Sequence, residues 1–163
     1  MTKINCWHAR AHENVSMWER YCPRGGVAVR STVGRLKRAL EDFRLDPRYG
    51  AEPIRIGRVK YLDYDADDFA DGSMLGIFFH KRAAFEDESE VRAILSLRMA
   101  VEFGVPIPDA GVPVAVDLTE LIDQVRVGPH HDPGMVERVE ADLRAVGVDC
   151  EVRTTTLADP PAY

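Results

Sequence analysis

Apolar residues alternate with polar ones in several short segments of the chain, and a period of two predicts β-strands. The expected strands span residues 2–8, 27–31, 54–64, 90–97, 112–116, 124–127 and 150–154. Val91, Ala93 and Leu95 define the buried face of the fourth strand. In the third strand the apolar parity changes near Gly57, so we expect a β-bulge at that glycine.

Apolar residues at helical spacing predict three principal helices. The expected helices lie at 14–21, from 33 onward and at 132–147, with a short helical turn at 119–122. Asn14, Thr32 and Asp132 have side chains that commonly cap the first turn of a helix, and Gly147 is typical of a helix end. The apolar segment 74–79 has no clean period and fits either a helical turn or a strand.

These elements do not alternate as strand, helix and strand, so the pattern does not indicate a parallel βαβ sheet. We expect an α+β fold with one mostly antiparallel mixed sheet of about seven strands and three principal helices. A length of 163 residues suits one hydrophobic core, so residues 1–163 are expected to form a single domain.

The composition, with 45% hydrophobic and 29% charged residues, is ordinary for a globular protein. No apolar run approaches the roughly 18 residues that a membrane-spanning helix needs, and the first residues lack the apolar core of a signal peptide. Three cysteines without CxxC spacing favour reduced thiols. We therefore expect a cytoplasmic protein with no membrane partner.

The net charge of −6 argues against general nucleic-acid binding, because such binding depends on cations that neutralise phosphates. The charges are unevenly distributed along the chain. Residues 24–60 hold ten Lys or Arg and four Asp or Glu, whereas residues 61–90 hold two and nine. These blocks form either a basic and an acidic lobe or two solvated faces that attract each other.

The acidic block contains the residues best suited to chemistry. If the segment is extended, Glu88, Glu90 and Arg92 share one face of it. Two carboxylates beside an arginine can hold a polyhydroxyl ligand such as a ribose, and one of them can stabilise a developing cation at a glycosidic carbon. The alternative is a solvent-exposed ladder in which Arg92, Lys81 and Arg82 only pair with the acids.

The first 32 residues hold both tryptophans, a hydroxyl pair and two of the five histidines, including His8, a density typical of residues that line a ligand. Trp18 and Tyr21 share one helix face, where they either pack in the core or stack on a planar ring such as nicotinamide or a base. Ser31 and Thr32 end a strand and open a helix, where they either bind an anion or only cap the helix.

Four side chains near the amino end are of the kinds that zinc favours: Cys6, His8, His12 and Cys22. Their spacing matches no zinc module, so no metal site is predicted. We expect a packed Cys6 and a hydrogen-bonded His8 instead. A metal-dependent hydrolase that uses Cys6, His8 and His12 is kept as a minor hypothesis.

Several short motifs occur together along nearly the whole chain. They are Asn5-Cys6-Trp7-His8, Ser16-Met17-Trp18 with Tyr21, Val27-Ala28-Val29 with Ser31-Thr32, and Lys81-Arg82 with Glu88, Glu90 and Arg92. In this combination the chain resembles a widespread bacterial and phage family described only as a domain of unknown function. The resemblance implies no activity. Longer members carry an additional amino-terminal segment, so this chain resembles a shortened member.

The chain also resembles ADP-ribosyltransferases that use an arginine, a Ser-Thr pair and a Glu-x-Glu motif. Ser31-Thr32 and Glu88-x-Glu90 occur here in the expected order. The resemblance implies that the first pair supports a nicotinamide–ribose pocket, that Glu90 stabilises an oxocarbenium-like ribose, and that NAD is the cofactor. The chain departs from the pattern because no arginine precedes Cys6.

The leading hypothesis is a domain that binds NAD or another nucleotide, as an ADP-ribosyltransferase-like protein in a defence or toxin setting. Its catalytic residues would be Glu88 and Glu90. Its binding residues would be His8, Trp18, Tyr21, Ser31, Thr32, Lys81, Arg82 and Arg92. The alternative is a truncated family member with no enzymatic activity, or a non-catalytic interaction module that pairs with another chain, including a second copy, through an exposed sheet edge. The leading hypothesis requires these side chains to meet on one concave surface.

Overall fold

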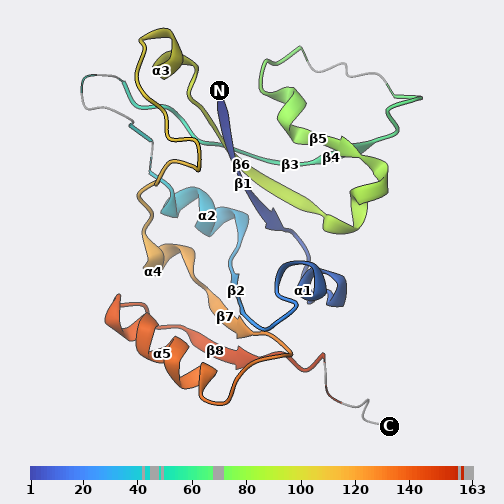
Figure 1. Cartoon of the computed structure of the whole chain (residues 1–163), viewed down its shortest axis with the longest axis vertical. Helices are drawn as coiled ribbons and strands as arrows, with labels where there is room; N and C mark the ends of the chain where they lie inside the picture. Colours follow the sequence, from blue (N-terminus) through green and yellow to red (C-terminus); the bar gives the residue numbers. More distant parts are fainter. Residues whose placement is uncertain (42, 45–47, 49, 68–71, 158, 160–163) are drawn as a thin grey trace. The chain divides into compact units, whose positions relative to one another are not determined.

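The computed structural model describes residues 1–41, 43–44, 48, 50–67, 72–157 and 159. The chain divides into two compact units (Figure 1): unit 1 comprises Met1–Ala11 and Glu41–Ala115, and unit 2 comprises His12–Leu40 and Val116–Tyr163. Helices and sheets occur in both, which confirms the α+β class. The expectation of one sheet of about seven strands is wrong, because the described strands form three separate sheets. The single domain stays a prediction.

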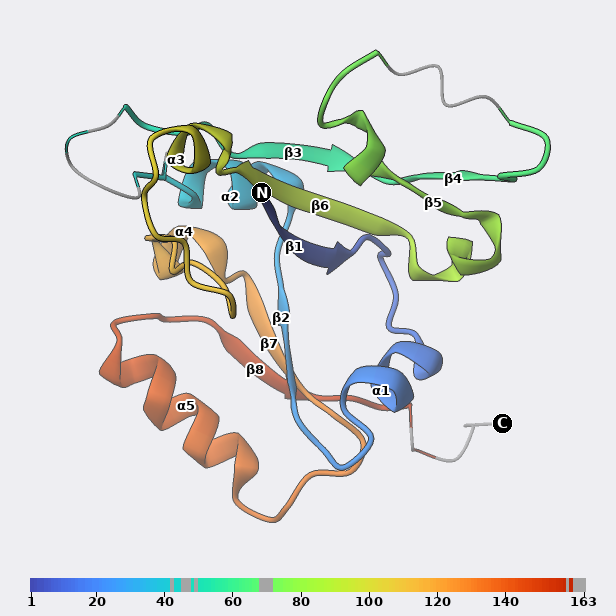
Figure 2. The same cartoon turned by 45° about the horizontal axis from the view of Figure 1, so that its top comes forward.

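Unit 1 contains a three-stranded antiparallel sheet in the order β1 (Thr2–His8), β6 (Glu90–Ser96) and β3 (Arg55–Arg58) (Figure 2). Strand β1 has the predicted bounds. The central strand β6 is buried on both faces, since Val91 and Ile94 are 3% and 0% exposed and successive side chains of a strand point to opposite faces. The sequence pattern had indicated burial only on the face of Val91.

The segment predicted as one strand at 54–64 forms two strands that belong to different sheets. After β3, strand β4 (Lys60–Leu62) pairs in parallel with β5 (His80–Arg82). Between β3 and β4, the Val59 N–H still donates to the Glu90 carbonyl at 2.9 Å. The change in apolar parity therefore arises where the chain leaves one sheet for the other.

Gly57 lies within β3, which pairs with β6 without interruption, so the predicted bulge is wrong. A Cβ atom at Gly57 would lie 2.8 Å from the ring of Phe79, closer than real Cβ atoms approach a neighbour. The glycine therefore allows an aromatic ring to lie directly on the strand. That ring belongs to the 3₁₀ helix η1 (Gly76–Phe79), which settles the alternative left open for 74–79 in favour of a helical turn.

Two further short helices of unit 1 are η2 (Ala83–Glu88) and α3 (Arg98–Glu102). The strand predicted at 112–116 is wrong, although Val112 and Val114 pack against the core as its alternation required. That part of the core consists of Phe43, Leu95, Leu97 and Ala100. Pro113 lies between the two valines and has no N–H to donate to a neighbouring strand.

Unit 2 contains a second three-stranded sheet in the order β2 (Val27–Arg30), β7 (Gln124–Val127) and β8 (Glu151–Thr154). Strands β2 and β7 are antiparallel, whereas β7 and β8 are parallel. Helix α5 (Met135–Ala145) connects the parallel pair, so β7, α5 and β8 form one βαβ unit, which the sequence pattern did not indicate.

The remaining helices of unit 2 are α1 (Val15–Tyr21), α2 (Val33–Ala39) and α4 (Leu118–Leu121). Two predicted N-caps are confirmed: Asn14 accepts from the N–H of Ser16 at 2.9 Å, and Thr32 accepts from the N–H of Arg35 at 3.1 Å. The predicted cap of α5 is wrong, because that helix follows Gly134 instead of Asp132.

No helix among the described residues has both the length and the apolar composition that a membrane span requires. The longest, α5, has 11 residues.

Close backbone approach in unit 2 depends on Gly25. Its φ is +93°, and a Cβ atom there would lie 2.0 Å from the carbonyl oxygen of His130. Gly147, which follows α5, also has a positive φ of +74° but has no atom within 4 Å of a Cβ position. The two glycines therefore separate the effect of backbone conformation from that of steric contact.

We expect Gly25→Ala to lower the free energy of unfolding by about 3 kcal/mol or more, because it combines an unfavourable φ with a backbone clash. Gly147→Ala should lower it by only about 1 kcal/mol, the cost of the left-handed conformation alone. Urea unfolding of both variants measures the difference. Equal losses would show that the Gly25 contact does not exist in solution.

Candidate functional site

The charged residues singled out from the sequence meet in unit 1 in a group that we call the acid–base cluster: Lys81, Glu88, Glu90 and Arg92. The Lys81 Nζ donates to Glu88 Oε2 at 2.6 Å and to Glu90 Oε1 at 2.7 Å. The Arg92 Nε donates to Glu90 Oε2 at 2.6 Å. Two anions and two cations therefore form one continuous chain of contacts.

The two carboxylates converge by a different route from the one expected. Glu88 does not precede Glu90 in an extended strand, because it ends helix η2 and Ser89 adopts a left-handed conformation with φ 45° and ψ 53°. This turn directs both carboxylates to Lys81. Their side chains are only 6% and 8% exposed, so the ion pairs form in the interior and not in a solvent-exposed ladder.

Glu90 is the most strongly perturbed acid of the cluster. Burial raises the pKa of its carboxyl group, but hydrogen bonds from Arg92 and Lys81 outweigh that effect and lower the pKa from 4.5 to about 2. Burial lowers the pKa of Lys81, and its hydrogen bonds to Glu88 and Glu90 reverse this and leave the pKa raised. Glu90 is therefore an anion at neutral pH, with a cation on each oxygen, and has no proton to donate as a general acid.

Three further side chains surround the acid–base cluster. The Tyr61 hydroxyl accepts from the N–H of Glu90 at 2.7 Å. The Nδ1 of His8 lies 2.6 Å from the Glu88 carbonyl oxygen, which can only accept, so Nδ1 carries the proton. The expected hydrogen-bonded His8 is thus confirmed. As a whole residue Cys6 is exposed, so the expected packed Cys6 is wrong. Its thiol group is nevertheless partly shielded from solvent and lies near Glu90, and this partial desolvation and the Glu90 charge raise the thiol pKa.

Arg82 does not join the acid–base cluster. Its guanidinium group lies over the ring of Tyr64, 4.7 Å from the ring centre, in a cation–π contact. Lys81 makes a similar contact with Phe85 at 4.8 Å in addition to its two ion pairs.

The hydroxyl pair lies in unit 2 and has contacts that explain it structurally. The Ser31 Oγ donates to the Leu121 carbonyl at 2.6 Å, and Thr32 caps α2. These contacts agree with the capping alternative. Helix α2 has only seven residues, so the helix dipole at its amino end attracts an anion only weakly.

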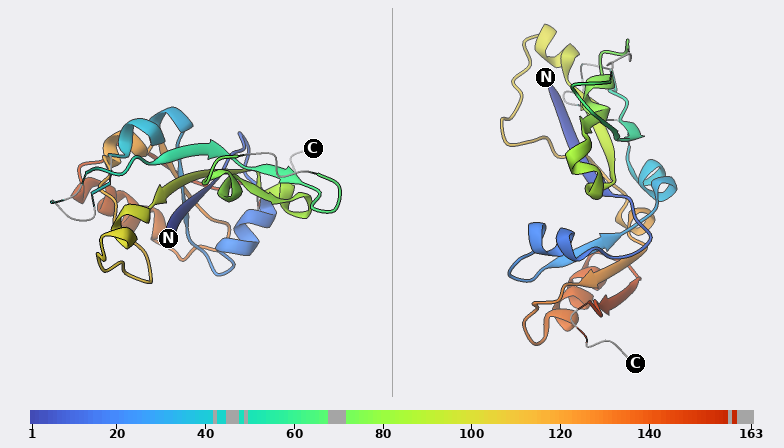
Figure 3. Two further views of the ribbon diagram at one scale, coloured as in Figure 1. Left: turned by 90° about the horizontal axis from the view of Figure 1, so that it is seen from above. Right: turned by 90° about the vertical axis from the view of Figure 1, so that its right-hand side faces the viewer.

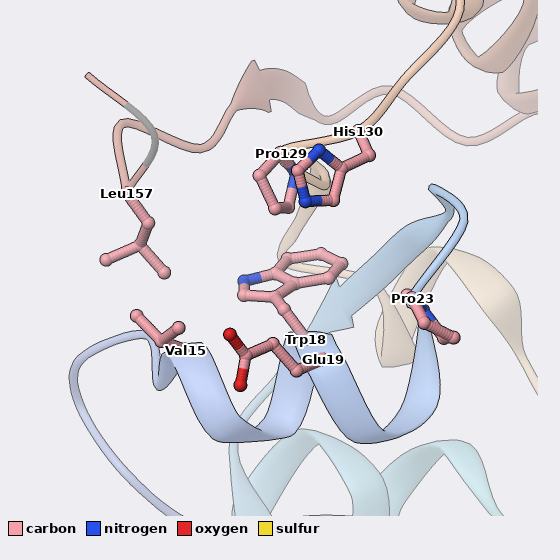
Figure 4. Close-up of a pocket in the computed structure, with 8 residues that line it drawn as sticks. Val15, Trp18, Glu19, Pro23, Pro129, His130 and Leu157 are labelled. Atoms are coloured by element: carbon pink, nitrogen blue, oxygen red, sulfur yellow. The ribbon is translucent and has the colours of Figure 1, made fainter.

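Trp18 forms one wall of a pocket within unit 2, which we call the Trp18 pocket (Figure 4). Its cavity measures about 280 Å³. The lining residues come from α1, the turn after it, the loop after β7 and the carboxyl-terminal segment: Val15, Trp18, Glu19, Cys22, Pro23, Pro129, His130 and Leu157. In Figure 4 the rings of Pro129 and His130 lie across from the indole of Trp18.

Several contacts hold the indole of Trp18 in place, and the residue as a whole is 7% exposed. Its Nε1 donates to Glu13 at 3.2 Å, and Glu13 in turn pairs with Arg126. A Cβ atom at Gly128 would lie 2.9 Å from the indole, so the strand end after β7 approaches the ring closely. Trp18 is thus a core residue, which agrees with the first of its two alternatives, and it also borders the pocket. Stacking on a planar ring stays a prediction.

Tyr21 does not line the Trp18 pocket, although it shares α1 with Trp18, and it is 62% exposed. Glu19 and His130 line the pocket, although no motif in the sequence singles them out. Gly128-Pro129-His130 is typical of a turn, but no local pattern indicates that this turn faces α1.

The residues of the leading hypothesis are divided between the two units, and neither unit by itself contains the predicted concave surface. Unit 1 holds His8, the acid–base cluster and Arg82, and unit 2 holds Trp18, Tyr21, Ser31 and Thr32. Within the described ranges, no three His, Cys, Asp or Glu side chains are grouped as a metal site requires.

The chain matches no model of a known protein family, no curated protein and no solved structure. The resemblances to the bacterial and phage family and to ADP-ribosyltransferases therefore stay predictions based on the motifs. A function has to be argued from the acid–base cluster and the Trp18 pocket themselves.

We expect Glu90→Gln to lower the free energy of unfolding by on the order of 3 kcal/mol, because it leaves Lys81 and Arg92 buried with one anion fewer. Glu102→Gln is the matched control, since Glu102 forms an ion pair with Arg98 at 2.6 Å in which both side chains are about half exposed. That change should cost less than about 0.5 kcal/mol. A fully stable Glu90→Gln protein would contradict the structural role of the cluster.

The stabilisation by Glu90 should depend on pH. Since folding lowers its pKa from 4.5 to about 2, its contribution is complete above pH 4.5 and declines as the pH falls toward 2. Urea unfolding of the wild type and Glu90→Gln at neutral pH and near pH 3 measures this. We expect the difference between the two proteins to shrink at the lower pH, and a constant difference would exclude the linkage.

Proposed function

We propose that unit 2 is a binding module for a small planar heteroaromatic ring, such as the base or the nicotinamide group of a nucleotide, and that the ring binds in the Trp18 pocket. The observation that carries this proposal is the cavity of about 280 Å³ with a fixed indole as one wall. The proposal keeps the nucleotide-like ligand of the sequence analysis and assigns it to a site within one unit.

The size and the lining of the Trp18 pocket both suit such a ligand. Pockets for drug-sized molecules hold roughly 300–1,000 Å³, so this cavity suits one ring system and not a whole dinucleotide. Since Trp18 is only 7% exposed, a ring in this cavity contacts only part of the indole and gains only part of the stacking energy of a fully stacked base, which is about 1–3 kcal/mol. The apolar side chains of Val15 and Leu157 flank the indole on one side and complete a surface for the faces and edges of a ring (Figure 4).

Two polar side chains give the Trp18 pocket a preference among rings. The Glu19 carboxylate accepts hydrogen bonds, so it favours rings that carry an amino or carboxamide group, such as adenine or nicotinamide. The same charge repels a ring with a carboxylate, such as nicotinic acid. The imidazole of His130 lies across from the indole and offers a second planar surface.

The proposal assigns binding and no catalysis. To act on a ribose, the carboxylate of Glu90 would have to be free to face the ligand. Its two oxygens already accept hydrogen bonds, one from Lys81 and the other from Arg92. We therefore give the acid–base cluster a structural role and leave ADP-ribosyl transfer, the defence setting and the cytoplasmic location as predictions.

The chain offers a direct reporter, because Trp7 and Trp18 are its two tryptophans. In a Trp7→Phe background we expect nicotinamide and adenosine to quench the fluorescence of Trp18 to saturation. Nicotinic acid should have no saturable effect. Glu19→Gln should weaken the binding of nicotinamide about fivefold or more, since it removes a charged hydrogen-bond acceptor.

Two control variants make this test decisive. Trp18→Phe keeps Trp7 as the reporter and should show only the linear quenching of collisions in solution. Tyr21→Ala changes an exposed aromatic residue of the same helix and should leave binding unchanged. Linear quenching in both single-tryptophan proteins would refute the proposal.

A further inference from the structure

We infer that strand β1 is an interaction surface and that its partner is β1 of a second copy of this chain, paired antiparallel across the free edge of the sheet in unit 1. This inference does not rest on the ligand of unit 2. It starts from the position of β1, which is the outer strand of the order β1, β6, β3 (Figure 3).

The backbone register shows which groups of β1 face outward. The Ala9 N–H donates to the Ser89 carbonyl at 2.8 Å, and the Leu97 N–H donates to the Met1 carbonyl at 2.9 Å. Odd-numbered residues of β1 therefore form the hydrogen-bonded pairs with β6. The N–H and C=O groups that point away from β6 belong to Thr2, Ile4, Cys6 and His8. No other strand of the described chain pairs with this edge.

The edge of β1 lacks two of the features by which proteins commonly prevent pairing, namely proline and short length. It is seven residues long and contains no proline. Its one lysine, Lys3, is directed to the carbonyl oxygens of Pro108 and Asp109 at 2.9 and 3.0 Å. The opposite edge, β3, is protected by its short length of four residues and by the charged side chains of Arg55 and Arg58 at its ends.

A second copy fits this edge because β1 is complementary to itself. In antiparallel pairing of two identical strands the outward even-numbered residues must form the hydrogen-bonded pairs. The register centred on Asn5 satisfies this and pairs all seven residues. In it Lys3 faces Trp7 of the second copy and Ile4 faces Cys6 of the second copy, so no two lysines face each other.

This pairing adds about eight backbone hydrogen bonds and joins two three-stranded sheets into one continuous antiparallel sheet. It also covers the exposed side chain of Ile4, which is 40% accessible in the single chain. A three-stranded sheet is small, and sheets of about four to six strands are the commonest.

Sedimentation of the wild-type chain across a wide range of concentrations should show a reversible dimer. Cys6→Pro should weaken the dimer about tenfold to a hundredfold, because it removes one outward N–H from each copy but no bond between β1 and β6. Cys6→Ser is the matched control and should dimerise like the wild type. Circular dichroism checks that both variants are folded.

The register has a separate test. In the register centred on Asn5, this residue faces itself in a non-hydrogen-bonded pair with a Cα separation of about 4.5 Å, within the range of disulfides. Asn5→Cys in a Cys6→Ser background should therefore form a cross-linked dimer under mild oxidation. Lys3→Cys in the same background should not, nor should Cys6→Ser alone. A monomeric wild type, a folded Cys6→Pro dimer of unchanged affinity or an absence of Asn5→Cys cross-linking would each overturn the inference.

Discussion

The structure of unit 1 depends on the pairing of four largely buried charges. A carboxylate removed from water costs several kcal/mol unless a cation and further hydrogen bonds replace the solvent. Here Lys81 contacts both carboxylates of the cluster, and Arg92 occupies the remaining oxygen of Glu90. Because these residues come from β5, η2 and β6, the three elements must keep one arrangement for all four charges to stay paired. The left-handed turn at Ser89 follows from the same requirement.

Both units also require glycine at positions where a neighbouring ring or backbone approaches the chain closely. In unit 1, Gly57 lets the ring of Phe79 lie on β3, next to the Arg92 contact with the Phe78 carbonyl. In unit 2, Gly25 and Gly128 let two turns approach His130 and Trp18. A side chain at any of these positions would push apart the elements that form the candidate sites, so packing and site geometry have a common cause.

The acid–base cluster and the Trp18 pocket differ in a way that explains why we propose ligand binding for the pocket and a structural role for the cluster. The acid–base cluster has its charges matched within the protein, so little of its electrostatic energy remains for a ligand. The Trp18 pocket has an indole fixed by Glu13 and by the strand end after β7, while the space beside it stays open. A preorganised apolar wall with a few polar groups is the usual form of a small-molecule site.

The sequence by itself determined the elements whose signals are local. Strand β1, helix α1 and the caps at Asn14 and Thr32 were predicted correctly, because period-two alternation and capping side chains act within a few residues. Only the tertiary structure decided the features that depend on partners distant in the chain. The alternating valines at 112–116 pack without a strand, residues 54–64 divide between two sheets, and Glu88 reaches Lys81 through a turn. In each case the local pattern states only that a side chain is buried or charged, and the three-dimensional neighbours decide what it contacts.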